Sequence, residues 1–199
     1  VPLGKSHEVW ALSVTNRSDV QRDLTLTGYA EFTNHSNYEQ DQVNLQYSLF
    51  ISRTQFQSDR IIQQIHGNLD ALSEQEQIDE KNVTERFFGL SGANVSSYCG
   101  EKEHFLGKYH GYGDPQGIAS GDLGNVTSYN ENSCGALSCI LSLAPGETRT
   151  VAYVLGAGGG SESSAVLNTY TDPAEQTARE LAELKDDWQK KLDHLKVDT

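Results

Sequence analysis

The sequence predicts an all-β fold, an antiparallel β-sandwich, followed by a C-terminal linker α-helix. Polar and apolar residues alternate with a period of two through the first two thirds of the chain, as in strands with one buried face. Short stretches rich in Asn, Asp, Gly and Ser separate the alternating segments. After Gly156 the apolar residues recur at spacings of three and four, which is typical of an amphipathic helix. Roughly seven or eight short strands of this kind favour a sandwich.

The first two expected strands are residues 7–15 and 22–32. In the first, Trp10, Leu12 and Val14 share one face. In the second, apolar and small residues at even positions alternate with polar or aromatic residues at odd positions. Turn-forming residues 16–19 lie between them, so we predict that the two strands form a hairpin.

Further strands are expected at residues 43–52, at 55–65 as their partner, and at 87–98. Residues 69–85 are acidic and glutamine-rich, which predicts an exposed excursion. Residues 101–132 show little periodicity and predict a long ordered loop. Residues 135–143 and 148–155, joined by the Ala144–Glu147 turn, predict a second hairpin.

The C-terminal part predicts a long helix over residues 174–195. Asp172 is a suitable N-cap, and Pro173 suits the first helical position. The helix carries a wide apolar stripe, which must lie on this sandwich or on a further domain: Leu181, Leu184, Trp188, Leu192 and Leu195. We therefore divide the chain into a sandwich domain, residues 1–160, and a helical linker, residues 161–199. Because the sequence contains no Met, we expect a piece of a longer protein, with a sandwich truncated at its N-terminal side.

Composition excludes several classes of protein. The chain has 199 residues, which suits one domain or one domain with an appendage. Lys and Arg number 15 against 28 Asp and Glu, a net charge of −13, so a nucleic-acid partner is not expected. No apolar stretch approaches the roughly 18 residues of a membrane-spanning helix. The three cysteines, Cys99, Cys134 and Cys139, predict buried free thiols in a reducing compartment, and hence a cytoplasmic protein.

Motifs for catalysis or metal binding do not emerge from the residues. Gly156–Gly160 imitates a dinucleotide-binding turn, but Ser161 stands at the third glycine position, and a flexible connection is the better interpretation. The six histidines lack metal-binding spacings, and the nucleophile elbow GxSxG is absent. The residues thus support neither a nucleophile triad nor a metal site, and we predict no metal ligand in this chain.

A surface of amides and aromatic rings is the remaining candidate site. Amides donate and accept hydrogen bonds together, which matches sugar hydroxyls, and rings cover the apolar face of a sugar. The alternative is a loop held by its own Asn and Tyr hydrogen bonds. Part of the surface lies on the outward side of the expected strand 43–52, at Asn44, Gln46 and Ser48. The other residues lie in the long loop and its flanks: Tyr98, Tyr109, His110, Tyr112, Asp114, Asn125, Tyr129, Asn130 and Asn132.

An ordered set of short motifs resembles the N-terminal domain of glycoside hydrolase family 94. The set begins with EVWALSVTN from Glu8 and NLQYSL from Asn44. It continues with FLG from Phe105, DP at Asp114, CGAL from Cys134 and LAPGE from Leu143. The resemblance covers essentially the whole chain, up to Trp188 and the closing VDT.

The resemblance implies an N-terminal sandwich, a helical linker, an (α/α)6-barrel and a small C-terminal domain. Family members are inverting phosphorylases of cellobiose, cellobionic acid, cellodextrins, chitobiose or laminaribiose. They use inorganic phosphate and no cofactor to form an α-sugar 1-phosphate, and an aspartic acid of the barrel acts as the proton donor. We therefore expect the catalytic residues to lie outside this chain, and the isolated chain to be inactive. The family's sandwich also supports a homodimer and helps to close the active site.

The resemblance also implies substrate-binding residues. Cellobiose phosphorylases carry a Gln-Arg pair near the acceptor sugar on the strand that matches residues 44–49. Here the pair is Gln46 and Tyr47. The two side chains should point to opposite faces of a strand, so Gln46 is the stronger candidate. With Tyr112 of the loop, they are the predicted sugar contacts. Two alternatives are a stand-alone carbohydrate-binding sandwich and a purely structural dimerisation domain.

Overall fold

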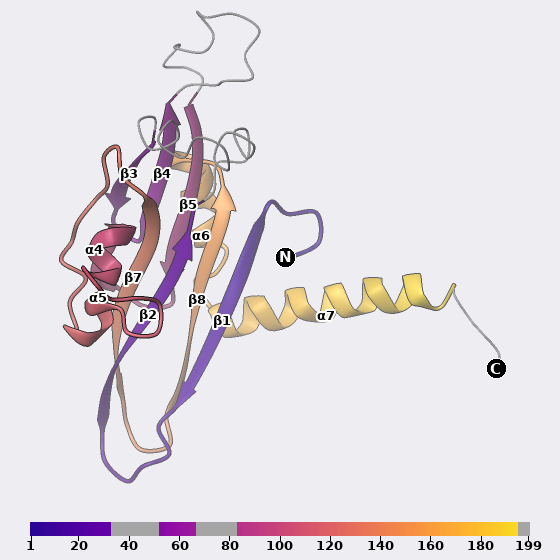
Figure 1. Ribbon diagram of the computed structural model, residues 1–199. Helices are drawn as coiled ribbons and strands as arrows, with labels where there is room; N and C mark the ends of the chain where they lie inside the picture. Colours follow the sequence, from indigo (N-terminus) through magenta and orange to yellow (C-terminus); the bar gives the residue numbers. More distant parts are fainter. Residues whose placement is uncertain (33–51, 67–82, 195–199) are drawn as a thin grey trace, which may run out of the picture.

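The computed structural model describes residues 1–32, 52–66 and 83–194 (Figure 1). It confirms the predicted antiparallel β-sandwich. One sheet, sheet A, has the strand order β1-β8-β5-β4-β3. Sheet A consists of β1 (His7–Thr15), β8 (Thr148–Ala157), β5 (Val83–Ser91), β4 (Arg60–His66) and β3 (Ser52–Gln57). The other sheet, sheet B, has the order β2-β7-β6 and consists of β2 (Arg22–Glu31), β7 (Ser133–Leu143) and β6 (Val95–Glu101).

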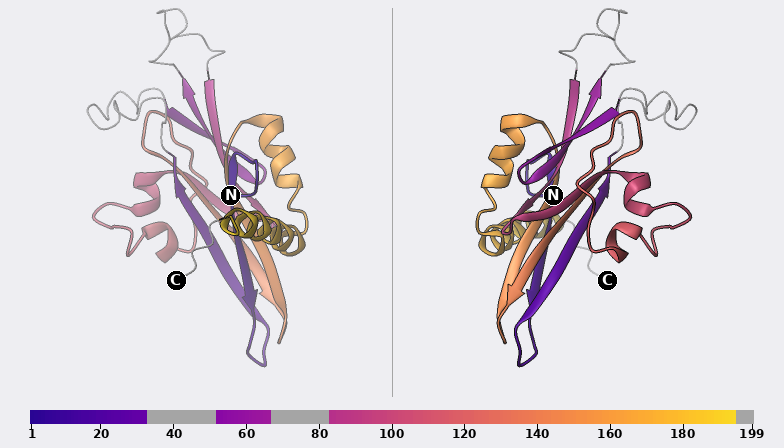
Figure 2. Two further views of the ribbon diagram at one scale, coloured as in Figure 1. Left: turned by 90° about the vertical axis from the view of Figure 1, so that its right-hand side faces the viewer. Right: turned by 90° about the vertical axis from the view of Figure 1, so that its left-hand side faces the viewer.

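Short and long helices cover the two outer faces of the sandwich (Figure 2). On the outer side of sheet B lie α4 (Lys102–Leu106) and α5 (Gln116–Ala119). On the side of sheet A lie α6 (Gly160–Asn168) and α7 (Pro173–Leu192). The long α7 begins beside β1 and β8 and then extends away from both sheets (Figure 1). The expected loop at residues 101–132 therefore contains two short helices.

Both predicted hairpins are wrong in their pairing, although all four strands exist. β1 pairs with β8, and β2 pairs with β7, so each expected hairpin is instead a connection that crosses from one sheet to the other. In such an arch, as in a hairpin, both strands turn their apolar faces toward the same interior. The alternation of residues is therefore the same in the two arrangements and cannot identify the partner strand.

Asn16 joins the two crossing connections. Its side-chain amide donates to the carbonyl oxygens of Leu143 at 2.9 Å and Val20 at 2.8 Å. Its backbone N–H donates to the Glu147 carbonyl at 2.9 Å, and its own carbonyl accepts from Gly146 at 2.8 Å. Asn16 is only 4% exposed, so this buried amide holds the two arches side by side.

Two expected single strands are each split in two. Residues 55–65 contain parts of both β3 and β4, which form a tight hairpin around Ser58 and Asp59. Ser58 has a φ of 54°, as a tight two-residue turn of this kind requires. Residues 87–98 likewise contain parts of β5 and β6, which belong to different sheets. The expected strand 43–52 lies outside the described residues except for Ser52, and most of the excursion 69–85 also lies outside them.

The interior between the sheets is apolar. Trp10 and Val14 of β1 pack against it as predicted, but Leu12 is 43% exposed because β1 is the edge strand of sheet A. Tyr98, expected on the sugar-binding surface, instead stacks on Phe56 with ring centroids 3.8 Å apart. The centre of the interior consists of Ile61, Phe88, Leu90, Leu137, Cys139, Leu141, Leu143, Val151 and Tyr153.

Helix α7 has the predicted start. The Asp172 carboxylate accepts a hydrogen bond from the Glu175 N–H at 3.1 Å, and the buried Pro173 follows as the first residue. Its apolar stripe is largely uncovered within the described residues: Leu181, Trp188 and Leu192 are 51%, 55% and 55% exposed. Among the described helices, none combines the length and hydropathy needed to cross a membrane.

Candidate functional site

One of the three predicted sugar contacts is placed by the structure. Tyr112 lies in the connection between α4 and α5, on the outer side of sheet B. Gln46 and Tyr47 lie outside the described residues. Tyr112 is 61% exposed, so its ring is available to a ligand or partner.

Tyr112 belongs to a cluster centred on one carboxylate, which we call the Tyr112 cluster and define as Tyr29, Glu31, Lys102 and Tyr112. The hydroxyls of Tyr112 and Tyr29 both donate to Oε1 of Glu31, the latter at 3.0 Å. Lys102 Nζ lies 3.0 Å from the other carboxylate oxygen. The same ammonium lies 5.3 Å from the centre of the Tyr112 ring. The cluster therefore joins the end of β2 to the start of α4.

A small core beneath α4 supports the cluster. The Tyr29 ring stacks on Phe105, with centroids 4.4 Å apart and planes inclined by 16°. Phe105 is 3% exposed and packs with Cys99, Leu123, Cys134 and Ala136. The position of the Tyr112 hydroxyl is thus fixed from below, through Glu31 and Tyr29, whereas its ring faces solvent.

The electrostatics of the cluster favour binding over proton transfer. Partial burial alone would raise the pKa of Glu31, but the hydrogen bonds from Tyr112, Lys102 and Tyr29 outweigh it and lower that pKa. Contacts with Tyr112 and then Glu31 raise the pKa of Lys102. Both groups are therefore charged at neutral pH. A fixed carboxylate, an ammonium and an exposed ring can hold a hydroxyl-rich ligand, but the carboxylate holds no proton to donate.

Other predicted surface residues are tied down within the loop. His110 Nδ1 lies 3.0 Å from Oδ2 of Asp114, the Asn125 carbonyl oxygen accepts from the Tyr98 N–H at 3.1 Å, and the Asn132 amide donates to Glu103. These contacts favour the alternative that the residues stabilise their own loop. Tyr109 differs because its side chain is fully exposed.

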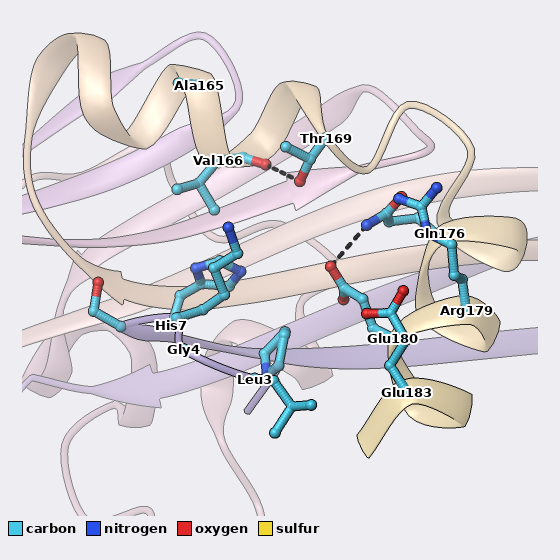
Figure 3. Close-up of a pocket in the computed structure, with 13 residues that line it drawn as sticks. Leu3, Gly4, His7, Ala165, Val166, Thr169, Gln176, Arg179, Glu180 and Glu183 are labelled. Carbon is cyan, nitrogen blue, oxygen red and sulfur yellow. Dashed lines mark hydrogen bonds between the residues drawn. The ribbon is translucent and has the colours of Figure 1, made fainter. Parts of the chain in front are cut away.

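A second candidate region, a cavity of about 810 Å³, lies between the N-terminal segment, α6 and α7 (Figure 3). Its lining includes Lys5, His7, Arg179, Glu180 and Glu183. Sequence reasoning did not find this cavity, because its residues come from the two ends of the chain and share no motif.

A hydrogen-bonded chain of three side chains closes one side of this cavity. His7 Nε2 lies 2.9 Å from the Tyr170 hydroxyl, which donates to the Glu180 carboxylate at 3.0 and 3.2 Å. Because the hydroxyl has one proton and donates it to Glu180, His7 Nε2 carries a proton and donates to Tyr170. The Gln176 amide also donates to Glu180, at 2.7 Å. These hydrogen bonds link three parts of the fold: β1, the segment that follows α6, and α7.

Burial determines the charge state of His7 and Tyr170. It lowers the pKa of His7, and the positive charges of Lys5 and the N-terminal amine lower it further. The Glu180 carboxylate acts in the opposite direction and raises it. Burial and the nearby Glu180 raise the pKa of Tyr170. Neutral His7 and neutral Tyr170 thus join α7 to the sandwich. Across the described part of the chain, no group of three or more His, Cys, Asp or Glu side chains is arranged to hold a metal ion.

Taken together, the fold and the Tyr112 cluster define a β-sandwich module that presents an exposed aromatic ring beside a hydrogen-bonded ion pair. The sequence matches the model of the glycosyl hydrolase 94 supersandwich domain over residues 1–183. The chain belongs to this family, as the ordered motifs predicted.

Two relatives are N,N'-diacetylchitobiose phosphorylases, from Vibrio furnissii and Vibrio proteolyticus. Each is 28% identical to this chain over 162 residues, which cover 81% of this chain and 19% of the relative. The chain thus spans about a fifth of the length of these phosphorylases.

Proposed function

We propose that this chain is the non-catalytic sandwich part of an inverting phosphorylase. The whole protein would cleave a β-linked gluco-disaccharide with inorganic phosphate and release α-glucose 1-phosphate, or the corresponding N-acetylated sugar phosphate. The match to the supersandwich domain over residues 1–183 carries this proposal. The two chitobiose phosphorylase relatives support it.

The proposed role of the sandwich is to shape the rim of the sugar site. Tyr112 offers an exposed ring whose hydroxyl is already held by Glu31, so binding would cost little side-chain entropy. Gln46 would hydrogen-bond the acceptor sugar, and Tyr47 would contribute a second ring nearby.

The remaining parts of the proposal concern the whole protein. Its catalytic barrel would follow on the same polypeptide, and its subunits would form a homodimer in the cytoplasm. Inorganic phosphate would be the co-substrate, without a further cofactor. The sandwich alone would be inactive, because the proton donor of the reaction would lie in the barrel.

The activity test uses the full-length protein and measures phosphate-dependent release of sugar 1-phosphate. The substrates are N,N'-diacetylchitobiose, cellobiose, cellobionic acid, cellotriose and laminaribiose. Release from one of them supports the proposal and identifies the substrate. A folded protein that releases no sugar phosphate from any of them contradicts it.

The rim residues are tested by Gln46→Ala and Tyr112→Ala, with Ile118→Ala, an exposed residue of α5, as the control. Loss of the Gln46 hydrogen bond to the sugar costs about 1–3 kcal/mol of transition-state stabilisation, and Tyr112→Ala removes the ring that would contact the sugar. We expect kcat/KM for the disaccharide to fall in the first two variants and to stay unchanged in the control. Unchanged kinetics in all three would restrict the sandwich to scaffolding.

A second candidate is a stand-alone module for carbohydrate binding or dimerisation. The exposed rings of Tyr112 and Tyr129, 61% and 71% accessible, favour this alternative. Titration of the isolated chain with the same sugars separates the two functions. Saturable binding without the remainder of the protein supports the stand-alone module, because one side of a shared site binds sugar poorly.

A further inference from the structure

Two of the three thiols of the chain are neighbours. Cys99, Cys134 and Cys139 are all free and 0% exposed. Cys99 lies on β6 and Cys134 on the adjacent β7, and both face the small core beneath α4. Cys139 also lies on β7, but it faces the interior between the sheets. The chain thus contains a pair of contacting thiols and an isolated thiol of equal burial.

Local backbone geometry brings the pair together. In regular sheets, diagonal neighbours on adjacent strands lie about 7–8 Å apart, which is beyond the roughly 7 Å that a disulfide can span. Here the pairing is irregular between Cys99 and Glu101, so the register shifts beside Cys134. The Cys134 thiol consequently reaches the Cys99 carbonyl oxygen, with a separation of 3.5 Å. The Cys99 thiol itself donates to the Glu101 carbonyl oxygen at 3.2 Å, on the same irregular stretch of β6.

The environment gives the two sulfurs different roles. Interaction with the Cys134 thiol lowers the pKa of Cys99, whereas interaction with Cys99, together with burial, raises the pKa of Cys134. Cys99 is therefore the thiol of the pair that ionises more readily. A thiolate is the form of cysteine that attacks an oxidant.

The cover over the pair is thin. It consists mainly of the five-residue helix α4, through Phe105, and of Leu123 in the following segment. Opening such a short surface element requires much less energy than separating the two sheets above Cys139. A small neutral oxidant can therefore reach the pair when Cys139 remains protected.

We propose that Cys99 and Cys134 form a peroxide-sensitive dithiol that closes reversibly to a disulfide. The Cys99 thiolate attacks one oxygen of hydrogen peroxide, the O–O bond breaks, and hydroxide leaves. Cys99 is then a sulfenic acid. The Cys134 sulfur attacks the Cys99 sulfur, the S–O bond breaks, and water leaves with the Cys134 proton. Both thiols are oxidised, and the peroxide is reduced to water.

The dithiol lies directly below the Tyr112 cluster. Phe105 belongs to the small core that contains both cysteines, and Tyr29 stacks on Phe105. Closing the disulfide therefore changes the support of Glu31 and Tyr112. This inference does not depend on the phosphorylase proposal, because the oxidation is measured on the protein itself.

The experiment treats the full-length protein with hydrogen peroxide, blocks the remaining thiols by alkylation and maps the peptides by mass spectrometry. We expect a Cys99–Cys134 peptide lighter by two hydrogen atoms, an alkylated Cys139, and recovery of both thiols with dithiothreitol. Within this chain the reactive thiols of the denatured protein then fall from three to one.

Two variants sharpen the test. Cys134→Ala removes the resolving sulfur, so Cys99 should accumulate as a sulfenic acid that a dimedone probe labels. Cys139→Ala should leave disulfide formation unchanged. Persistence of all three thiols in the wild-type protein, or oxidation of Cys139 as fast as the pair, overturns the proposal.

Discussion

The two outer faces of the sandwich are stabilised in different ways. On sheet A, α6 and α7 are held by the buried chain of His7, Tyr170 and Glu180. On sheet B, a short helix is held by the stacking of Phe105 and Tyr29, and an exposed carboxylate cluster lies above it. One face buries its tyrosine hydroxyl, whereas the other presents a tyrosine ring to solvent.

This difference indicates a division of labour between the faces. Tyr170 is 0% exposed and connects three elements, which suits a joint that sets the direction of α7. Tyr112 is 61% exposed and connects one loop to one strand, which suits contact with another molecule. Variants that affect the two faces separately can test this distinction.

The largest effect is expected for Phe105→Ala. The side chain is 3% exposed and supports both α4 and Tyr29, so its removal leaves a cavity and costs about 3–5 kcal/mol of unfolding free energy. Urea unfolding measures this loss. Ile118→Ala on the neighbouring α5 is the control, because Ile118 is 48% exposed and should change stability by only about 0.5 kcal/mol. Equal losses in both variants would show that Phe105 does not support this face.

The next effect compares the two tyrosines directly. Tyr170→Phe leaves His7 and Glu180 without their shared hydroxyl, and we expect a loss of about 1–3 kcal/mol. Amide hydrogen exchange should also become faster in the first turns of α7. Tyr112→Phe removes one hydrogen bond at the surface and should cost about 0.5–1 kcal/mol. A larger loss for Tyr112→Phe than for Tyr170→Phe would contradict the proposed division.

Sequence patterns predicted the local structure better than the long-range contacts. The starts of β1 and α7 follow from alternation at His7–Thr15 and from the Asp172–Pro173 cap, both of which are local signals. The partners of β1 and β2 do not follow, because an arch and a hairpin share the same alternation. The register of β6 against β7, which brings Cys99 to Cys134, is likewise a property of the assembled sheet.

The candidate sites show the same limit. Tyr112 was found because aromatic residues are concentrated in its loop, but its partners Glu31 and Lys102 come from β2 and α4 and share no motif with it. His7, Tyr170 and Glu180 are still further apart in the sequence. Composition was informative only for the segment that contains Tyr112, whereas the convergence of several segments required the fold in both cases.

The third effect is a pH dependence of stability, which arises from His7 on the face of sheet A. The pKa of His7 is lowered in the folded protein, so the unfolded chain binds the proton more readily. Stability from this group is therefore complete above the ordinary pKa of 6.5 and decreases as the pH falls below it.

The measurement compares the unfolding free energies of the wild-type protein and His7→Gln at about pH 7.5 and about pH 5.5. The wild-type protein should lose more stability than the variant on acidification, because glutamine does not titrate. Glu180 and Glu183 on α7, Arg179 beside them, and Lys5 and the N-terminal amine also face this region and are common to both proteins. Identical pH dependence in the two proteins would remove His7 from the joint.

The smallest effect is expected for Glu31→Gln on the face of sheet B. Its side chain is 38% exposed, and exposed ion pairs contribute about 0.2–1 kcal/mol. The pKa of Glu31 is lowered in the folded protein, so its contribution is present above the ordinary value of 4.5 and is lost as the pH falls through the lower folded value. The wild-type protein should thus exceed the variant in stability at neutral pH and approach it in acid. Because Lys102 and both tyrosines bind this one carboxylate, the same substitution should also release the Tyr112 ring, which faster ring motion in NMR relaxation would reveal. If the ring remains as ordered as before, the loop itself holds Tyr112 in place. Glu31 then does not preorganise the ring for contact with a ligand.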